Sequence, residues 1–194
     1  MASTTPNMHK DLNLGNRGER YVFDTLASLG HDVNTVKWMD DPDTQRDGID
    51  GYVNGLAVDV KTQRSKYLDS PNILVEMLCD VDNQKPGWLH NQKTDWVLWS
   101  FASKEGIHPF GWAMPHTPKL ERFVVRYIEN DLPDFKRVQN RTWASLNCVI
   151  PIDDWPRDML IPVAFEQLTT FPPENHLIST YDNQKALPGE TRFY

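Results

Sequence analysis

Two aspartates and a lysine, Asp50, Asp59 and Lys61, have types and a spacing that would suit metal-dependent chemistry. The two aspartates lie on either side of Asn54-Gly55, which joins two short runs of β-type residues and predicts a tight hairpin. With a two-residue loop, Asp50 stands opposite Asp59, with the two Cβ atoms about 5 Å apart. Two carboxylates at that separation repel each other unless a cation neutralises them. Because Mg²⁺ prefers one or two carboxylates together with water and phosphate oxygens, it is the expected partner.

The second strand of this hairpin has one polar and one apolar face. Lys61 follows Asp59 by two residues and therefore projects from the same face, and Gln63 follows there too. The residues that alternate with them are apolar and are expected to face a core: Leu56, Val58 and Val60. The hypothesis is a catalytic face that carries Asp50, Asp59, Lys61 and Gln63. The alternative is a hairpin whose polar face meets solvent, with Asp59 and Lys61 as ordinary surface charges.

A helix upstream of the hairpin brings a further carboxylate towards it. The segment from Asn16 to Leu29 has apolar residues at helical spacing, which predicts a helix. Glu19 shares one face of this helix with Val22 and Phe23, so its carboxylate is expected to point towards the sheet. The alternative is that Glu19 is an acid of the first turn that complements the helix dipole.

The remaining pattern predicts an α/β fold with a mixed β-sheet flanked by helices. A short strand is expected before the hairpin, two strands after the hairpin are expected to continue the same sheet, and a further strand and a last strand are expected beyond them. Thr117-Pro118 is typical of a helix start and is followed by an apolar stripe. The expected strands cover residues 32–38, 72–81, 95–101, 107–114 and 145–152. Residues 1–168 are expected to form the folded domain, and residues 169–194 an extended or partly disordered tail.

These residues resemble the PD-(D/E)xK nuclease superfamily. The resemblance is carried by Gly18-Glu19 on the opening helix, by Gly48-Ile49-Asp50-Gly51, and by Ala57-Val58-Asp59-Val60-Lys61-Thr62-Gln63. It is closest to the archaeal-type Holliday-junction resolvases and the small phage nucleases. The family implies a restriction-endonuclease-like core of helix, strands, helix and strand, and beyond Gln63 the resemblance extends to the order of elements only.

The resemblance also implies roles for individual residues. Asp50 and Asp59 would be metal ligands, Val60 would offer its carbonyl oxygen, Lys61 would be the catalytic lysine, and Glu19 would complete the site directly or through water. This chain departs from the family pattern in two ways. Isoleucine precedes the first acid where the family has proline, and the second acid is aspartate where glutamate is commoner. A literal Pro-Asp occurs at Pro42-Asp43, but a residue so far upstream cannot stand opposite the second acid in a tight hairpin.

The charge and hydropathy of the chain limit its partners. A net charge of −7 argues against a protein that binds nucleic acid over its whole surface. Any basic residues that contact nucleic acid must therefore be concentrated in one part of the surface. Four basic residues near the site in sequence are candidates for phosphate contacts: Arg17, Arg20, Arg64 and Lys66. No apolar run has membrane-spanning length, and no apolar signal core follows Met1. We therefore expect a cytoplasmic protein, in the host cytoplasm if it is viral, with no membrane partner.

The expected activity is that of a DNA endonuclease that depends on Mg²⁺ or Mn²⁺ and hydrolyses phosphodiester bonds. DNA is the expected partner. Branched DNA and a homodimer are expected if the enzyme is resolvase-like, since a resolvase needs two active sites. The alternative is a catalytically inactive protein of the same fold that binds nucleic acid or a host protein.

Overall fold

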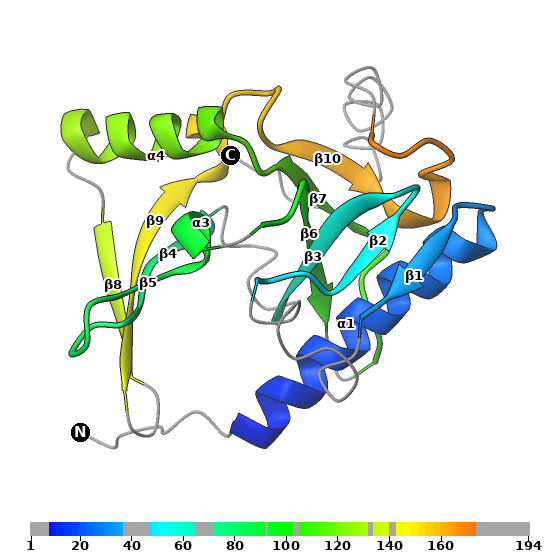
Figure 1. Cartoon of the computed structure of the whole chain (residues 1–194), viewed down its shortest axis with the longest axis horizontal. Coiled ribbons are helices and arrows are strands. Elements are labelled where there is room, and N and C mark those ends of the chain that lie inside the picture. The colour runs from blue at the N-terminus through cyan, green and yellow to red at the C-terminus, as the bar shows by residue number, and fades with distance from the viewer. Residues whose placement is uncertain are drawn as a thin grey trace, which may run out of the picture.

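The computed structural model describes residues 8–36, 47–64, 72–91, 93–102, 105–131, 134–139 and 143–173. Two β-sheets and two longer helices make up the fold (Figure 1). The helices are α1 (Met8–Ser28), α3 (Trp88–Asn91) and α4 (Pro118–Asp131), with short 3₁₀ turns at Ile152–Asp154 and Phe165–Gln167. The strands are β1 (Val33–Thr35), β2 (Gly51–Val53), β3 (Leu56–Arg64), β4 (Asn72–Asp80), β5 (Lys85–Pro86), β6 (Trp96–Ala102), β7 (Phe110–Pro115), β8 (Asp134–Gln139), β9 (Ala144–Pro151) and β10 (Ile161–Ala164).

The larger sheet is mixed, which confirms the predicted α/β class. Its strand order is β1-β2-β3-β6-β7-β10. Strands β3 and β6 run parallel, and every other neighbouring pair in this sheet is antiparallel. A parallel pair needs a crossover connection, and β4, β5 and α3 together form it. The strand that carries the candidate residues, β3, therefore lies inside the sheet with a neighbour on each side.

The hairpin predicted around Asn54-Gly55 is present with the predicted register. Asn54 and Gly55 have φ angles of 50° and 81°, as a two-residue turn with the twist of a hairpin requires. Val53 is paired with Leu56, and the ladder continues to the pair Gly51 and Val58. The two-residue loop thus fixes which residues of β2 and β3 face each other, and it brings Asp50 to the end of the ladder.

Helix α1 covers one face of this sheet. It extends further towards the N-terminus than predicted, to Met8, and ends before Gly30, which has a φ of 92°. Its apolar stripe packs on alternate residues of β3 and on neighbouring strands, in a buried cluster that includes Val22, Phe23, Leu26, Val58, Val60 and Leu98. The contact is closest at Gly18, because a Cβ atom there would lie 1.9 Å from Thr62 Oγ1. A glycine at this position lets the helix approach β3 at the level of the candidate site.

The second sheet corrects one prediction, because β4 and β9 do not continue the first sheet. Its order is β5-β4-β9-β8, with antiparallel pairing throughout. Both edges of β3 are occupied, by β2 and β6, so the crossover strand β4 has to pair elsewhere. The predicted flanking by helices is also incomplete: α1 covers one face of the first sheet, while the second sheet, α3 and α4 cover the other. Their buried cluster includes Val75, Trp88, Val97, Trp99, Val124 and Cys148.

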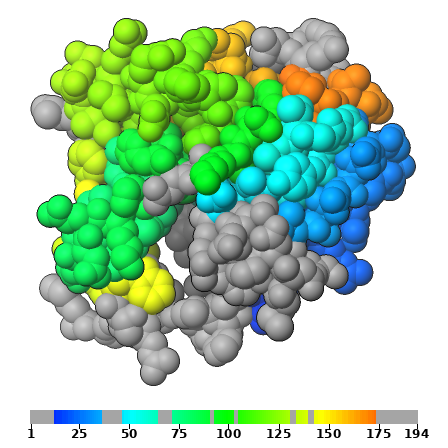
Figure 2. Space-filling model, in the orientation of Figure 1, coloured from blue at the N-terminus to red at the C-terminus, as the bar shows by residue number. Residues whose placement is uncertain are grey.

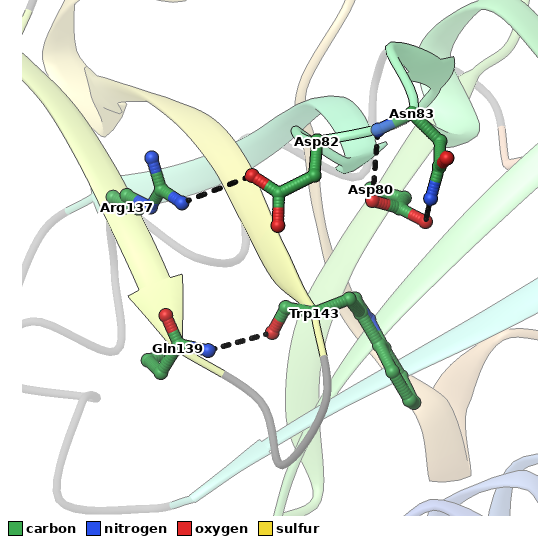
Figure 3. Close-up of polar contacts among 6 residues, drawn as sticks. All are labelled: Asp80, Asp82, Asn83, Arg137, Gln139 and Trp143. Carbon is green, nitrogen blue, oxygen red and sulfur yellow. Dashed lines mark hydrogen bonds and ion pairs between the residues drawn. The ribbon is translucent and has the colours of Figure 1, made fainter.

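Polar contacts lie around the turn after β4 and join this turn to β8 of the second sheet (Figure 3). Asp80 accepts hydrogen bonds from the backbone N–H and the side-chain amide of Asn83, at 3.2 and 2.7 Å. Asp82, in the turn after β4, pairs with Arg137 of β8 at 3.5 Å. In Figure 2 the second sheet and α4 form one side of the molecule, and the β2–β3 hairpin with α1 forms the other.

The C-terminal part of the described chain adds an edge strand that the sequence pattern did not reveal. Strand β10 pairs with β7, and Ile161 and Val163 join the cluster beneath α1. Of the predicted tail, residues 169–173 are described, and Phe171 is buried against the same cluster; residues 174–194 lie outside the described part. None of the described helices combines the length and the apolar character that a bilayer crossing requires.

Candidate active site

Lys61 and Asp59 form a close ion pair on β3. The Lys61 Nζ atom lies 3.0 Å from Asp59 Oδ1 and 2.7 Å from Oδ2. The Asp59 side chain is only 3% exposed, and that of Lys61 is 31% exposed. Since Asp59 stands beside Val97 and Lys61 beside Trp99 in the ladder with β6, both project towards the second sheet. The polar face of β3 is therefore an interior face, and the surface-charge alternative does not describe it.

Asp50 lies where the β2–β3 ladder ends. Its backbone N–H donates to the Val58 carbonyl at 2.9 Å, and its Oδ2 atom accepts the Val60 N–H at 2.8 Å. The Asp50 carboxylate thus accepts the hydrogen bond that a backbone carbonyl of β2 would accept from Val60 if the ladder continued. A strand residue turns its N–H and C=O to the same side, so the Val60 carbonyl faces the side on which Asp50 lies. The Asp50 carboxylate and the backbone of β3 at Val60 therefore lie side by side.

The pKa of Asp50 reflects its burial and the carboxylates near it. Burial, then the charge of Asp59 and then that of Glu19, raises the pKa of Asp50 from an ordinary 3.8 to about 8. The Val60 N–H and the Lys61 ammonium lower this pKa, but they do not offset the other effects. Near neutral pH the Asp50 carboxyl therefore keeps a proton in the absence of a further cation.

Glu19 belongs to the same cluster. It lies in the middle of α1, so the alternative of a first-turn acid that complements the helix dipole does not apply. Burial raises its pKa, the charge of Asp59 raises it further, and the Lys61 ammonium lowers it. The close approach at Gly18 brings this turn of α1 against β3. The half-buried Glu19 carboxyl is consequently near enough for the charges of Asp59 and Lys61 to shift its pKa.

A fourth carboxylate, Glu76 of β4, was not among the sequence candidates. Burial raises its pKa, while the Lys61 ammonium and a hydrogen bond from the Trp88 N–H lower it. Burial alone would lower the pKa of Lys61, but Asp59, then Asp50 and Glu76, raise it above its ordinary value. The sequence did hold a signal for Glu76, since it is the only charged residue in the run Asn72 to Cys79.

The other sequence candidates differ in their placement. Gln63 is half-buried two residues beyond Lys61 on the same strand, beside Phe101 of β6. The candidate DNA contacts Arg17, Arg20 and Arg64 are exposed, and Arg20 pairs with Asp24 at 3.3 Å. Lys66 and Pro42-Asp43 lie outside the described residues. The structure therefore brings Glu19, Asp50, Asp59 and Lys61 together, with Gln63 close by along β3 and the arginines on the nearby surface of α1 and β3.

The donors at this site suit a hard divalent cation. In the part of the chain that the structure describes, no three His, Cys, Asp or Glu side chains gather closely enough to enclose a metal ion on their own. Magnesium does not require such an enclosure, because it commonly binds through one or two carboxylates and completes its shell with water and substrate phosphate. Asp50, Asp59 and the Val60 carbonyl are the groups that could hold such an ion.

No protein-family model matches the chain, and comparisons with curated proteins and with solved structures give no match either.

Proposed function

We propose that this protein is a metal-dependent DNA endonuclease of the PD-(D/E)xK type. The single observation that carries the proposal is the placement of Lys61 and Asp59 in contact on β3, with the Asp50 and Glu19 carboxyls in the field of the same pair. The order of α1, β1, β2, β3 and the parallel β6 supports the family core. Among the described residues between β3 and β6, the helix that the family has before its last strand is represented by the four residues of α3.

The proposed chemistry assigns a task to each residue. Asp50, Asp59 and the Val60 carbonyl would hold Mg²⁺ or Mn²⁺, with Glu19 acting directly or through water. A divalent ion bound there would lower the pKa of a water molecule and would neutralise charge on the phosphate. Lys61 is held by Asp59 in a partly exposed position, from which its ammonium can stabilise an attacking hydroxide and the developing charge on phosphate oxygens.

The surface charges complete the proposal. Arg17 and Arg64 are exposed on the two elements that carry the site, α1 and β3, and are assigned to the DNA backbone. Because the chain carries a net charge of −7, such local contacts have to supply the attraction for DNA. Branched DNA as substrate and a homodimer as the active form are further parts of the proposal. A binding protein without activity is the competing outcome.

The test is cleavage of supercoiled plasmid by the purified full chain, followed by a panel of linear, nicked and four-way-junction DNA. Cleavage should require Mg²⁺ or Mn²⁺ and should stop when a chelator is added in excess. Cleavage that persists after complete removal of metal contradicts the mechanism. DNA binding without cleavage under any metal supports the inactive alternative.

A further inference from the structure

Strand β8 is an edge strand that lacks the usual protection against pairing. It lies at one end of the second sheet, on the opposite side of the molecule from β1, and β9 is its neighbour among the described strands (Figure 1). An antiparallel edge strand turns the N–H and C=O groups of every second residue away from that neighbour, so a further strand can bind them. Proteins commonly protect such edges with a proline, a bulge or a very short strand. β8 spans six residues, contains no proline and keeps an unbroken register with β9.

The other edge strands that the structure describes each have such protection. β1 has three residues, and β5 has two, one of which is Pro86. β10 carries Pro162 at its second position, and two of its four residues are buried. In β8, by contrast, five of the six residues are exposed. Among the described edges, β8 is therefore the one that is open to a further strand.

The side chains of β8 show what a partner strand has to offer. Phe135 is 43% exposed, although it is large and apolar. Asp134 and Lys136 project from the face opposite to Phe135, because alternate residues of a strand face opposite sides. Neither of these two charges forms an ion pair with another described residue, whereas Arg137 and Gln139 are held by contacts within their own chain (Figure 3). The edge thus presents one exposed ring, with one negative and one positive charge beside it.

A second copy of β8 fits this edge in one register. In a twofold symmetric antiparallel pair the axis is perpendicular to the sheet and keeps each side chain on its own face. The pairing must then be centred on a residue that faces its own counterpart. A centre on a charged residue destabilises the pair because like charges face each other, and β8 has three such residues: Asp134, Lys136 and Arg137. A centre on Val138 or Gln139 leaves Phe135 with no facing residue in β8. Phe135 is the remaining centre.

We propose that β8 is the dimerisation edge of this protein, where it pairs antiparallel with β8 of a second copy and the two Phe135 rings face each other. In this register Asp134 of each copy faces Lys136 of the other, because both residues lie one position from the centre. Two opposite-charge pairs and one aromatic pair stabilise the contact, and the two four-stranded sheets become continuous. The inference specifies the homodimer of the proposed function and rests on it for its role in cleavage. The edge contains no residue of the candidate active site, so the two can be tested separately.

Sedimentation equilibrium of the full chain over a concentration series, in low-salt buffer without DNA, tests the interface. The wild type should show an equilibrium between monomer and dimer. Lys136→Asp and Asp134→Lys each place two like-charge pairs across the edge, and each should weaken the dimer by about tenfold or more. The double variant, with Asp134→Lys and Lys136→Asp together, restores opposite charges in the same register and should dimerise as the wild type does. Glu129→Lys, an exposed charge reversal on α4, is the control and should leave the dimer unchanged.

The outcomes separate this inference from the function on which its role rests. A wild type that stays monomeric at every concentration overturns the inference, as do single reversals that dimerise like the wild type. A double variant that dimerises no better than the single variants overturns the register. Thermal melting of each variant shows that a loss of the dimer does not come from unfolding, since the changes lie on an exposed edge. If the wild type is a dimer of this kind but cuts no DNA with any metal, the nuclease proposal fails and the interface stands.

Discussion

Replacing Asp50 with asparagine should change how the stability of the metal-free protein depends on pH. The pKa of Asp50 is about 8 in the fold, against an ordinary value of 3.8 that applies to the unfolded chain. Between these values the folded state keeps a proton that the unfolded state has lost. Stability is therefore highest below the lower value and falls as the pH rises towards the higher one. The asparagine variant has no proton to lose at this position, so most of that fall should disappear.

The size of the effect follows from this one proton. The wild type should lose about 1.4 kcal/mol of unfolding free energy per pH unit, or about 2 kcal/mol between about pH 6 and about pH 7.5. For a chain of this size that corresponds to a fall in melting temperature of about 4–8 °C, which Asp50→Asn should largely abolish. The raised pKa values of Glu19 and Glu76 leave a smaller slope of the same sign.

The assay is thermal melting across this pH range in chelator, repeated with excess Mg²⁺. Asp134→Asn, an exposed change on the outer strand of the second sheet, is the control and should keep the wild-type slope. Excess Mg²⁺ should stabilise the wild type, by about 2.7 kcal/mol at a hundredfold excess over the dissociation constant, and should stabilise Asp50→Asn far less. A wild type with no slope, or a variant that keeps the full slope and the full Mg²⁺ effect, refutes the assignment of Asp50.

Two further changes test how α1 and its carboxylate contribute. Gly18→Ala places a methyl group against Thr62 and Ser100, so it should destabilise the protein by about 1–3 kcal/mol in chemical denaturation and also lower cleavage by displacing the neighbouring Glu19. Gly106→Ala, where a Cβ atom would meet no heavy atom within 4 Å, should do neither. Glu19→Gln should lower single-turnover plasmid cleavage by about 10–100-fold, as changes beside a metal site usually do, while raising the metal-free melting temperature. Cleavage by Glu19→Gln at the wild-type rate would exclude Glu19 from the site.

The local part of the structure could be predicted because short-range rules govern it. The Asn54-Gly55 turn sets the register of β2 and β3, and the alternation along β3 identifies which residues share a face. The apolar stripe of α1 likewise predicts the face that Val22 and Phe23 bury. These rules use only neighbours in sequence, so they apply before any tertiary contact is known.

The layer in which a strand lies could not be predicted in the same way. Strand β4 has the composition of a strand of the first sheet, but β6 occupies the place beside β3, and β4 pairs with β9 in the second sheet. Glu76 was missed for the same reason, since its relation to Lys61 arises from the packing of α3 between the two layers. Phe171 was assigned to a tail because its partners, Trp96 and His31, are far from it in sequence.

The central claim, that Lys61 is the catalytic lysine of a metal-dependent nuclease, is tested most directly by comparing two lysine variants in one plasmid cleavage assay with Mg²⁺. Lys61→Ala should abolish cleavage and keep a cooperative melting transition at a lower temperature, because the change removes the ammonium paired with the buried Asp59 carboxylate but takes no side chain from the apolar core. Lys85→Ala removes an exposed lysine paired with Asp80 on the second sheet, and it should cut at the wild-type rate. Cleavage by Lys61→Ala at the rate of Lys85→Ala would contradict the claim.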